Sequence, residues 1–400
     1  MGHPGLSDEH ECLLAAVDAD FPDAAGLARW MAAHPEASLE EHETSQRYRE
    51  ALEARGFEIE KGVAGLETAF VARHGNPRAP LRAALLAEMD SLPEIGHACG
   101  HNLSGPASLL AAWALARVLP SEILEVVVVG CPAEELGLGK RRLVEAGVFG
   151  SVDVALMAHA SDMRRAHRLF LGNRKFDVVF HGRASHAAAY PERGVNALDG
   201  VIALFVAVGL LRQQLSREVR IHGIVTEGGS APNVIPERAA ARFWVRALDA
   251  DVLESASTRL CACAEGAALQ TGTRLELQPL EGGSPVMCPN HALASVYRRQ
   301  LERLGLPETP HAPETAIGSS DITHVSQRVP TIHPNFPIGQ DLQLHTREFA
   351  EAAGSPRGEE GLREASQALA LAVHELARDP AARAAVRAEF GGACCSTSTS

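Results

Sequence analysis

The sequence predicts a two-domain α/β protein, in which a catalytic domain with a mostly parallel sheet is interrupted by a smaller inserted domain. The chain has 400 residues, which is more than one domain usually holds. Apolar runs at residues 81–90, 125–131 and 152–159 alternate with helical segments. Such alternation is typical of a parallel sheet whose two faces are both covered by helices. A different pattern begins at about residue 174, which indicates the insertion.

The inserted segment has the order of a split β-α-β unit. We expect strands and helices at residues 175–182 (strand), 196–215 (helix), 218–226 and 239–246 (strands), 249–268 (helix) and 274–278 (strand). This β-α-β-β-α-β order predicts a ferredoxin-like lid or dimerisation domain at residues 174–287. The catalytic domain then comprises residues 1–173 and 288–388. The composition of residues 389–400 predicts a disordered tail.

Charge and composition exclude several classes of function. The formal net charge of -13 argues against nucleic acid or an anionic membrane as the main partner. We find no apolar run that approaches 18 residues and no secretion signal, so we expect no membrane partner. The 8 cysteines are too sparse for a disulfide scaffold and form no Cys-x-x-Cys pair. We therefore expect a cytoplasmic protein with reduced thiols.

Side chains able to bind a metal follow each of the three apolar runs. Cys99 and His101 follow the first run, Glu134 and Glu135 follow the second, and His159 ends the third. Groups at the carboxyl ends of parallel strands gather at one edge of the sheet. If residues 99–101 are extended, both of their side chains point the same way. Two imidazoles, a thiolate and a carboxylate are suitable ligands for zinc or a similar divalent ion.

Six motifs, in order along the chain, resemble the M20 metallopeptidases. They are Gly-His-Ala-Cys-Gly-His-Asn at 96–102, Pro-Ala-Glu-Glu at 132–135, Met-Ala-His at 157–159, Ser-His-Ala-Ala at 185–188, Gly-Ser-Ser-Asp at 318–321 and Leu-His-Thr-Arg-Glu-Phe at 344–349. Within this family they are similar to the M20D amidohydrolases. Asn102 stands where many members of that branch have Asp, and it favours the aminobenzoyl-glutamate hydrolase and β-alanyl-dipeptidase type.

The resemblance implies a site with two divalent metal ions, with Zn²⁺ favoured by the cysteine and Mn²⁺ also compatible. The implied metal ligands are Cys99, His101, Glu135, His159 and His345. Glu134 is the implied general base, which deprotonates a water molecule activated by the metals. His186 is the implied stabiliser of the tetrahedral oxyanion, and Asn233 the implied substrate contact.

The reaction implied is hydrolysis of the amide bond of a small N-acyl amino acid or dipeptide-like substrate. The same resemblance implies a homodimer formed through the inserted domain, with a monomer as the alternative.

Several alternatives remain open. His333, in the same loop region, is a rival to His345 as the last ligand. Asn102 removes a carboxylate that would otherwise support the ligands. A hydrolytic deaminase that uses the same two metals, and a catalytically silent binding protein with this fold, are the alternative functions. Release of ammonia would distinguish the deaminase.

Overall fold

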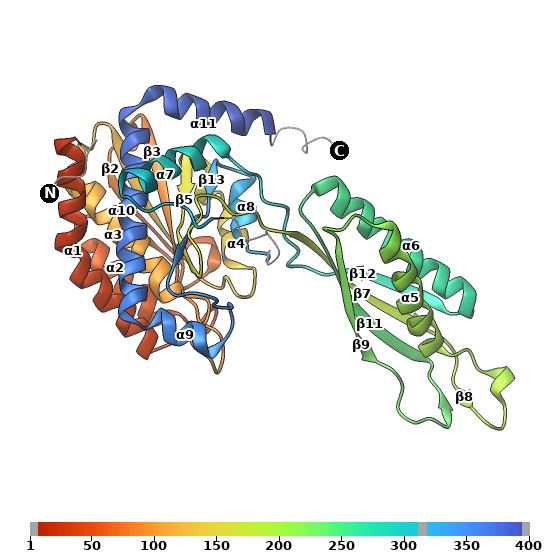
Figure 1. Ribbon diagram of the computed structural model, residues 1–400. Coiled ribbons are helices and arrows are strands. Elements are labelled where there is room, and N and C mark those ends of the chain that lie inside the picture. The colour runs from red at the N-terminus through yellow and green to blue at the C-terminus, as the bar shows by residue number, and fades with distance from the viewer. Residues whose placement is uncertain (1–6, 311–317, 394–400) are drawn as a thin grey trace. The chain divides into compact units, whose positions relative to one another are not determined.

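The structure, a computed structural model, describes residues 7–310 and 318–393. The chain divides into two compact units (Figure 1). The larger unit comprises residues 1–169, 288–316 and 320–400, and the inserted unit comprises residues 170–287 and 317–319. The insertion expected from the sequence was residues 174–287.

The larger unit is built on a six-stranded mixed sheet with the order β1-β2-β4-β3-β5-β13. Its strands are β1 (Glu58–Lys61), β2 (Phe70–Gly75), β3 (Leu81–Glu88), β4 (Leu124–Cys131), β5 (Val154–Leu156) and β13 (Thr331–Ile332). The strands from β4 to β13 are parallel, whereas β1 and β2 form an antiparallel edge. Every residue of β4 is buried, which explains its continuous apolar sequence. The predicted fold class is confirmed.

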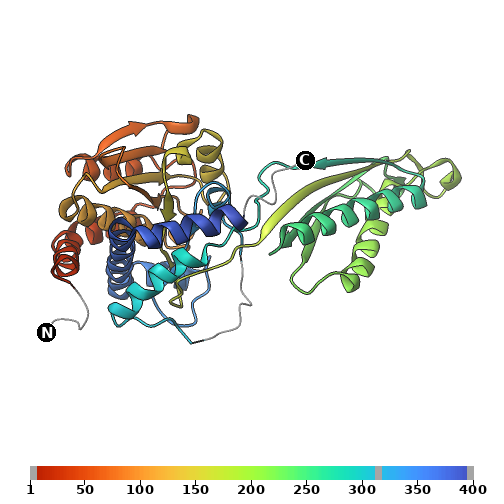
Figure 2. The same cartoon turned by 90° about the horizontal axis from the view of Figure 1, so that it is seen from above.

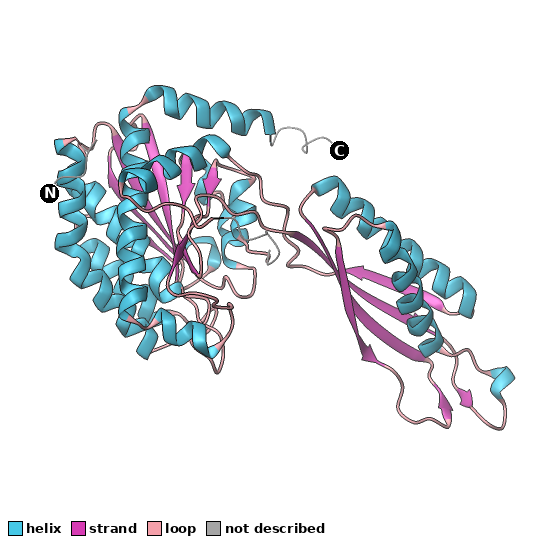
Figure 3. Cartoon of the chain, viewed as in Figure 1, coloured by secondary structure: helices cyan, strands magenta, loops and turns pink. Residues whose placement is uncertain are grey.

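Helices cover the sheet of the larger unit on both faces (Figure 3). They are α1 (Asp8–Ala33), α2 (His42–Glu53), α3 (His101–Val118), α4 (Gly139–Glu145), α7 (His291–Arg303), α8 (Ile322–Ser326), α9 (Arg347–Ala353), α10 (Pro356–Arg378) and α11 (Pro380–Ala393), with 3₁₀ turns at Val63–Gly65 and Val148–Ser151. Helix α3 contacts α1, α10 and β3. Because it is covered on all these sides, α3 is buried from its first residue to Leu115.

Two short strands form a parallel pair just after the third apolar run. β6 (His159–Ser161) pairs with β14 (Asn335–Pro337). His159 therefore begins a separate strand, and the expectation that it ends the run at residues 152–159 was wrong. The pairing with β3 ends at Leu156, whereas the pairing with the segment after β13 continues: the backbone N–H of Met157 donates to the carbonyl of Ile332 at 3.3 Å and that of His159 to the carbonyl of Pro334 at 2.9 Å.

The inserted unit has the predicted β-α-β-β-α-β order. Its elements are β7 (Gly172–His181), β8 (Ser185–His186), α5 (Ala197–Leu211), β9 (Arg220–Glu227), β10 (Val234–Ile235), β11 (Arg238–Ala247), α6 (Ala250–Thr271) and β12 (Arg274–Pro279), with 3₁₀ turns at Pro191–Arg193 and Arg212–Gln214. The sheet order is β12-β7-β11-β9, antiparallel throughout. Helices α5 and α6 lie side by side on one face of this sheet (Figure 1).

Helix α5 is more apolar than the sequence analysis assumed. Together with the following turn it forms a segment, Ala197–Gln214, with a mean hydropathy of 1.4 over 18 residues. By length and composition alone this segment is able to cross a membrane, although Asp199 and Arg212 interrupt its apolar sequence. A single segment of this kind, 33% buried here, is weak evidence for a membrane span. The outward side chains Ile202, Val206 and Leu210 are exposed.

The C-terminal region and one cysteine differ from expectation. Helix α11 lies beside α7 (Figure 2) and extends to Ala393, so residues 389–393 are helical rather than part of a disordered tail. The rest of that predicted tail, residues 394–400, lies outside the described residues. Five cysteines of the described residues are free thiols, but Cys288 is disulfide-bonded, which corrects the expectation that all thiols are reduced.

Candidate metal centre

The loop after β3 brings Cys99 and His101 to the same place, although not by being extended. Gly100 between them has a left-handed φ of 86°, and α3 begins at His101. The expectation of an extended segment was wrong because the chain turns sharply into the helix. A Cβ atom at Gly100 would lie 2.6 Å from the Cβ of Ala160, so only glycine fits this close approach.

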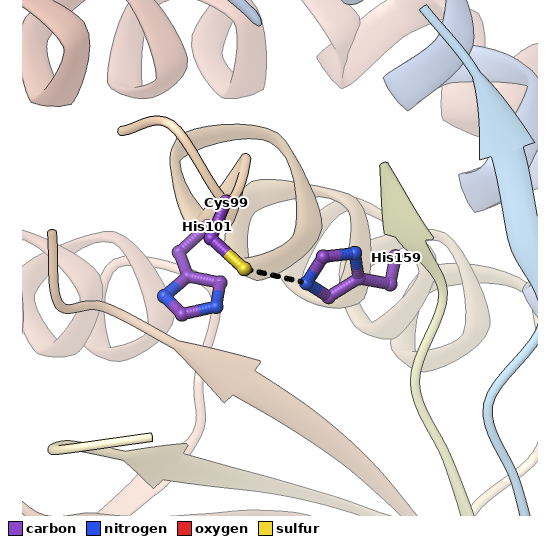
Figure 4. A group of neighbouring side chains, drawn as sticks. All are labelled: Cys99, His101 and His159. Carbon is purple, nitrogen blue, oxygen red and sulfur yellow. Dashed lines mark hydrogen bonds between the residues drawn. The ribbon is translucent and has the colours of Figure 1, made fainter. Parts of the chain in front are cut away.

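Cys99, His101 and His159 form a compact and buried group (Figure 4). One ligand atom from each of them lies within 4.8 Å of the others. The Sγ atom of Cys99 is 3.5 Å from Nε2 of His159. The three side chains come from the loop after β3 and from the start of β6, as the sheet-edge argument predicts.

In both His101 and His159, Nδ1 faces a backbone carbonyl oxygen, which leaves Nε2 for a metal. Nδ1 of His101 is 2.8 Å from the backbone carbonyl of Asp90, and Nδ1 of His159 is 2.8 Å from that of Ala160. Because a carbonyl only accepts, Nδ1 of each ring carries a proton, and Nε2 is the atom of each ring that would bind a metal. Burial lowers the pKa of His159 to about 4, so this ring is neutral at physiological pH.

The local charge favours a cation at His101. Burial lowers the pKa of this histidine, but the negative charge of Glu88 and the hydrogen bond to Asp90 outweigh burial, so that the pKa is raised well above its usual value. Nε2 of His101 is 3.3 Å from Oε2 of Glu88, and both atoms lack a hydrogen-bond partner among the described residues. The negative charge of Glu88 at this side of the cluster favours a positive ion.

The turn after β4 places two glutamates beside this group. Glu134 and Glu135 have carboxylate oxygens within 4.8 Å of the ligand atoms of Cys99 and His101. Ala133, immediately before them, has a left-handed φ of 55°. The backbone N–H of Glu135 donates to Oδ2 of Asp90 at 3.0 Å. The turn is therefore anchored to the loop that follows β3.

The geometry favours His345 over His333 as the last ligand. Nε2 of His345 is 3.5 Å from Oε2 of Glu135, and its backbone N–H donates to the carbonyl of Ala98 at 2.9 Å. The ring of His333 instead stacks against that of His159, with the centroids 5.2 Å apart. His333 therefore packs behind a ligand candidate, whereas His345 faces the carboxylate.

The donor set fits divalent metal ions. One thiol, two imidazoles and two carboxylates converge, with His345 beside Glu135, and they include the donor types that zinc prefers. Oε1 of Glu135 and Nε2 of His101 have no hydrogen-bond partner within the described part of the chain. Buried polar atoms are normally paired, so atoms left unpaired and aimed at one point indicate a ligand. Cys99, His101, Glu135, His159 and His345 are thus placed where they would hold the metals.

Asn102 does not support the ligands. Its Nδ2 atom donates to the carbonyl of Ala353 at 3.0 Å and to that of Ala28 at 3.5 Å. The side chain therefore links α3 to α9 and α1. The two carbonyl acceptors require the amide donor that Asn supplies, which an Asp side chain would lack.

His186 and Asn233 belong to the inserted unit. His186 is in β8, which pairs with β10, and the backbone N–H of Ala187 donates to the carbonyl of Asn233 at 3.0 Å. Nδ1 of His186 accepts from the backbone N–H of Ala188 at 3.3 Å and of Ala189 at 3.2 Å. The exposed Nε2 therefore carries the proton and is a hydrogen-bond donor.

Comparison with known proteins identifies the family. Residues 84–371 match the model of peptidase family M20/M25/M40. The chain belongs to this family. It is 36% identical over 386 residues to the Xaa-Arg dipeptidase of Mus musculus, covering 91% of this chain and 88% of the mouse protein. It is 32% identical over 314 residues to one of the chains of the p-aminobenzoyl-glutamate hydrolase of Escherichia coli, covering 73% of this chain and 65% of the bacterial one. It is therefore a hydrolase of the M20 type.

Solved structures share the fold. A dinuclear metal-binding M20 peptidase of Bacillus subtilis superposes with a TM-score of 0.71 at 21% identity, covering 90% of this chain and 99% of that one. A putative aminohydrolase of methicillin-resistant Staphylococcus aureus superposes with a TM-score of 0.78 at 19% identity, covering 91% and 98%. The M20 architecture thus extends over nearly all of this chain.

Sequence reasoning missed a buried charge cluster beside the candidate metal centre. Nζ of Lys140 lies 2.5 Å from Oε1 of Glu88 and 2.5 Å from Oδ1 of Asp321, and all three side chains are fully buried. Burial, followed by the charge of Glu88, raises the pKa of Glu134 to about 8. The sequence did contain a signal for this cluster: Glu88 is an acidic residue at the end of the apolar strand β3, where a buried charge requires a partner.

Proposed function

We propose that this M20 enzyme hydrolyses the amide bond of a dipeptide-like or N-acyl amino acid substrate, with two divalent cations and with Glu134 as the general base. The observation that supports this most directly is the position of Glu134. It adjoins the ligand candidate Glu135, and its carboxylate lies in the same cluster as Cys99 and His101. It is thus a spare carboxylate beside a complete set of donors.

The chemistry assigns a separate task to each group. The cations would polarise the substrate carbonyl and acidify a water molecule. With its pKa raised to about 8 by burial and by Glu88, the Glu134 carboxylate has a high proton affinity. It accepts a proton from the attacking water at its carboxylate oxygen and returns it to the nitrogen of the leaving amine. We also propose that His186 donates its Nε2–H to the developing oxyanion and that Asn233 contacts the substrate.

The relatives support the substrate class. The names Xaa-Arg dipeptidase and p-aminobenzoyl-glutamate hydrolase both describe cleavage of an amide bond to an amino acid. We propose the same bond for this chain. Among the metals, the Cys99 thiolate favours Zn²⁺, and the oxygen and nitrogen donors are also compatible with Mn²⁺.

The test is Glu134→Gln, with Glu60→Gln on the exposed strand β1 as the matched control. Dipeptides, N-acetyl amino acids and aminobenzoyl-glutamate are supplied with zinc, manganese or cobalt, and the products are identified by mass spectrometry. We expect Glu134→Gln to retain its metal content and to lose at least about 10²-fold in kcat. Unchanged turnover in this variant would exclude Glu134 as the base.

The same product analysis distinguishes the amidohydrolase from the two alternative functions, a deaminase and a catalytically silent binding protein. Ammonia in place of an amino acid would identify a deaminase. Metal binding without turnover of any of these substrates would favour the silent binding protein.

We further propose a homodimer formed through the inserted unit. An open apolar depression of about 400 Å³ is lined by Val201, Ile202, Phe205, Val206 and Val225, on α5 and β9. Contiguous exposed apolar surface of this kind favours association. Val206→Asp is expected to give a monomer in light scattering, whereas Leu269→Asp, on the exposed side of α6, is the control. A wild-type monomer would contradict the dimer.

A further inference from the structure

Glu41 is a buried carboxylate that the proposed chemistry does not use. It precedes α2 in the larger unit, and its side chain is fully buried. Burying a carboxylate is costly unless hydrogen bonds compensate it. The side chain makes no capping hydrogen bond to its own helix within the described residues, so helix capping does not explain it.

The carboxylate of Glu41 instead holds the turn that carries the two glutamates of the site. Its Oε1 atom accepts from the backbone N–H of Ala133 at 2.8 Å and from that of Leu39 at 2.9 Å. Its Oε2 atom accepts from Oγ1 of Thr68 at 2.9 Å. All three bonds come from donors outside α2, and the bond to Ala133 reaches the residue next to Glu134.

Both backbone donors are in an unfavourable conformation. Ala133 has a φ of 55° and Leu39 a φ of 72°, in the left-handed region that residues with a Cβ atom rarely adopt. Each such residue costs about 1 to 2 kcal/mol, and the conformation persists only where the surroundings enforce it. One carboxylate oxygen of Glu41 accepts from both of these strained residues, so it links the two turns.

A second carboxylate holds the other side of the same turn. Oδ2 of Asp90 accepts from the backbone N–H of Glu135 at 3.0 Å and from Oγ of Ser38 at 2.7 Å. The N–H groups on either side of Glu134 are thus held by Glu41 and Asp90. The orientation of the Glu134 side chain follows from a backbone fixed at these two points.

We propose that Glu41 is a positioning residue for Glu134 and Glu135, which keeps the strained turn at Ala133 in the conformation that directs both carboxylates into the metal site. The inference rests on the proposed function, in which Glu134 is the base and Glu135 a ligand. It predicts effects on metal affinity as well as on turnover.

The test compares three substitutions of Glu41 with Glu60→Gln as the exposed control. Glu41→Gln retains an oxygen for the two N–H donors, and its amide is able to donate to Thr68, so we expect activity within a few-fold of the wild type. Glu41→Leu removes both acceptors. Glu41→Asp keeps the charge but is one methylene too short to reach Ala133. For the last two variants we expect kcat to fall roughly 100-fold with little change in KM.

Metal affinity provides a readout that does not depend on turnover. Competition with a chromogenic chelator is expected to show weaker zinc binding in Glu41→Leu and Glu41→Asp, because Glu135 is displaced. Folding of each variant is checked by circular dichroism. If Glu41→Leu does not fold, Glu41→Asp carries the test. A folded Glu41→Asp protein with wild-type kcat and wild-type zinc affinity would overturn the proposal.

A second-site change separates positioning from loss of core packing. Glycine adopts the left-handed conformation without strain. Adding Ala133→Gly to Glu41→Leu is therefore expected to restore part of kcat and of the zinc affinity. A packing defect at residue 41 would not respond to this change, so equal losses in the single and double variants would refute the positioning role. If Glu134→Gln proves active, the proposed base fails, while the zinc affinity of the Glu41 variants still tests the position of Glu135.

Discussion

The ammonium of Lys140 lies 2.5 Å from the carboxylate of Glu88, and neither side chain has any exposed surface. Lys140 also binds Asp321 through Nζ at 2.5 Å and through its backbone N–H at 2.9 Å. Burial raises the pKa of Glu88, but the charges of Lys140 and then of His101 outweigh it and leave this pKa below the usual value. Glu88 is therefore ionised, and its other oxygen faces His101.

Loss of this buried cation is expected to destabilise the larger unit strongly. Lys140→Met leaves two buried carboxylates without their partner, at a cost of about 3 to 5 kcal/mol in the free energy of unfolding. Urea denaturation measures the change. Arg141→Met is the control, since Arg141 forms only a partly exposed pair with Glu145. A loss below about 1 kcal/mol in Lys140→Met would show that the carboxylates find another partner.

The sulfur of Cys99 is expected to bind the metal directly. In the cobalt-substituted protein, a thiolate ligand gives a sulfur-to-cobalt charge-transfer absorption. We expect this absorption in the wild type and in Cys131→Ser, a buried control cysteine whose thiol donates to the carbonyl of Val129. We expect it to be absent in Cys99→Ser. Its persistence in Cys99→Ser would assign the sulfur ligand elsewhere.

Gly100 is expected to control how well the first two ligands are placed. Gly100→Ala adds the strain of a left-handed residue and a contact of 2.6 Å with Ala160. We therefore expect zinc affinity to fall about 10- to 100-fold. Gly62→Ala, at a left-handed glycine with no neighbouring atom within 4 Å, introduces the strain alone and is expected to leave zinc affinity unchanged. Equal affinities in the two variants would contradict this account.

The link between α7 and α10 is expected to weaken in acid. Burial raises the pKa of Glu375. Hydrogen bonds from Arg299 and Gln300 lower this pKa by more than burial raises it, so the net pKa is below the usual value. A carboxyl group with a lowered pKa stabilises the fold above its unfolded pKa, and this stability is lost as the pH falls through the folded pKa.

Urea titrations at pH 7 and pH 3 test the contribution of Glu375. Glu375→Gln is expected to reduce the free energy of unfolding by about 1 to 3 kcal/mol at pH 7. The deficit is expected to shrink between pH 7 and pH 3, because a falling pH protonates the wild-type side chain and makes it resemble glutamine. Glu360→Gln, in a more exposed pair with Arg357, is the control. A deficit that does not vary with pH would rule out the ionic origin.

Local sequence was sufficient for the elements whose burial is uniform. The β-branched run of β4 predicted a strand covered on both faces, and every residue of that strand is buried. The end of α11 was missed because its composition resembles a disordered tail. Glu389 nevertheless accepts from the backbone N–H groups of His291 and Ala292 at the start of α7, at 2.9 and 2.7 Å. Together with the hydrogen bond from Nδ2 of Asn290 to the carbonyl of Val386, this tertiary contact holds the helix against α7.

The candidate site residues that directly follow predicted strands could be found from the sequence. The residues that reach the site from other segments were less predictable. Cys99 and Glu135 follow β3 and β4, so a sheet-edge argument finds them. Nothing in the local sequence shows that Glu41 bonds the backbone of Ala133, because this contact joins distant segments that meet only in the folded sheet. The choice between His345 and His333 depended for the same reason on tertiary geometry.

The proposed ligands are divided by the inserted unit. Four of them precede it in the chain, whereas His345 follows it, as does β14, the strand that pairs with the ligand-bearing β6. During synthesis on the ribosome, the growing chain therefore displays an incomplete set of donors until nearly all of it has been translated. The full set of proposed ligands is therefore available to bind the cations only late in biosynthesis. A truncated chain that ends before residue 345 lacks one of these ligands.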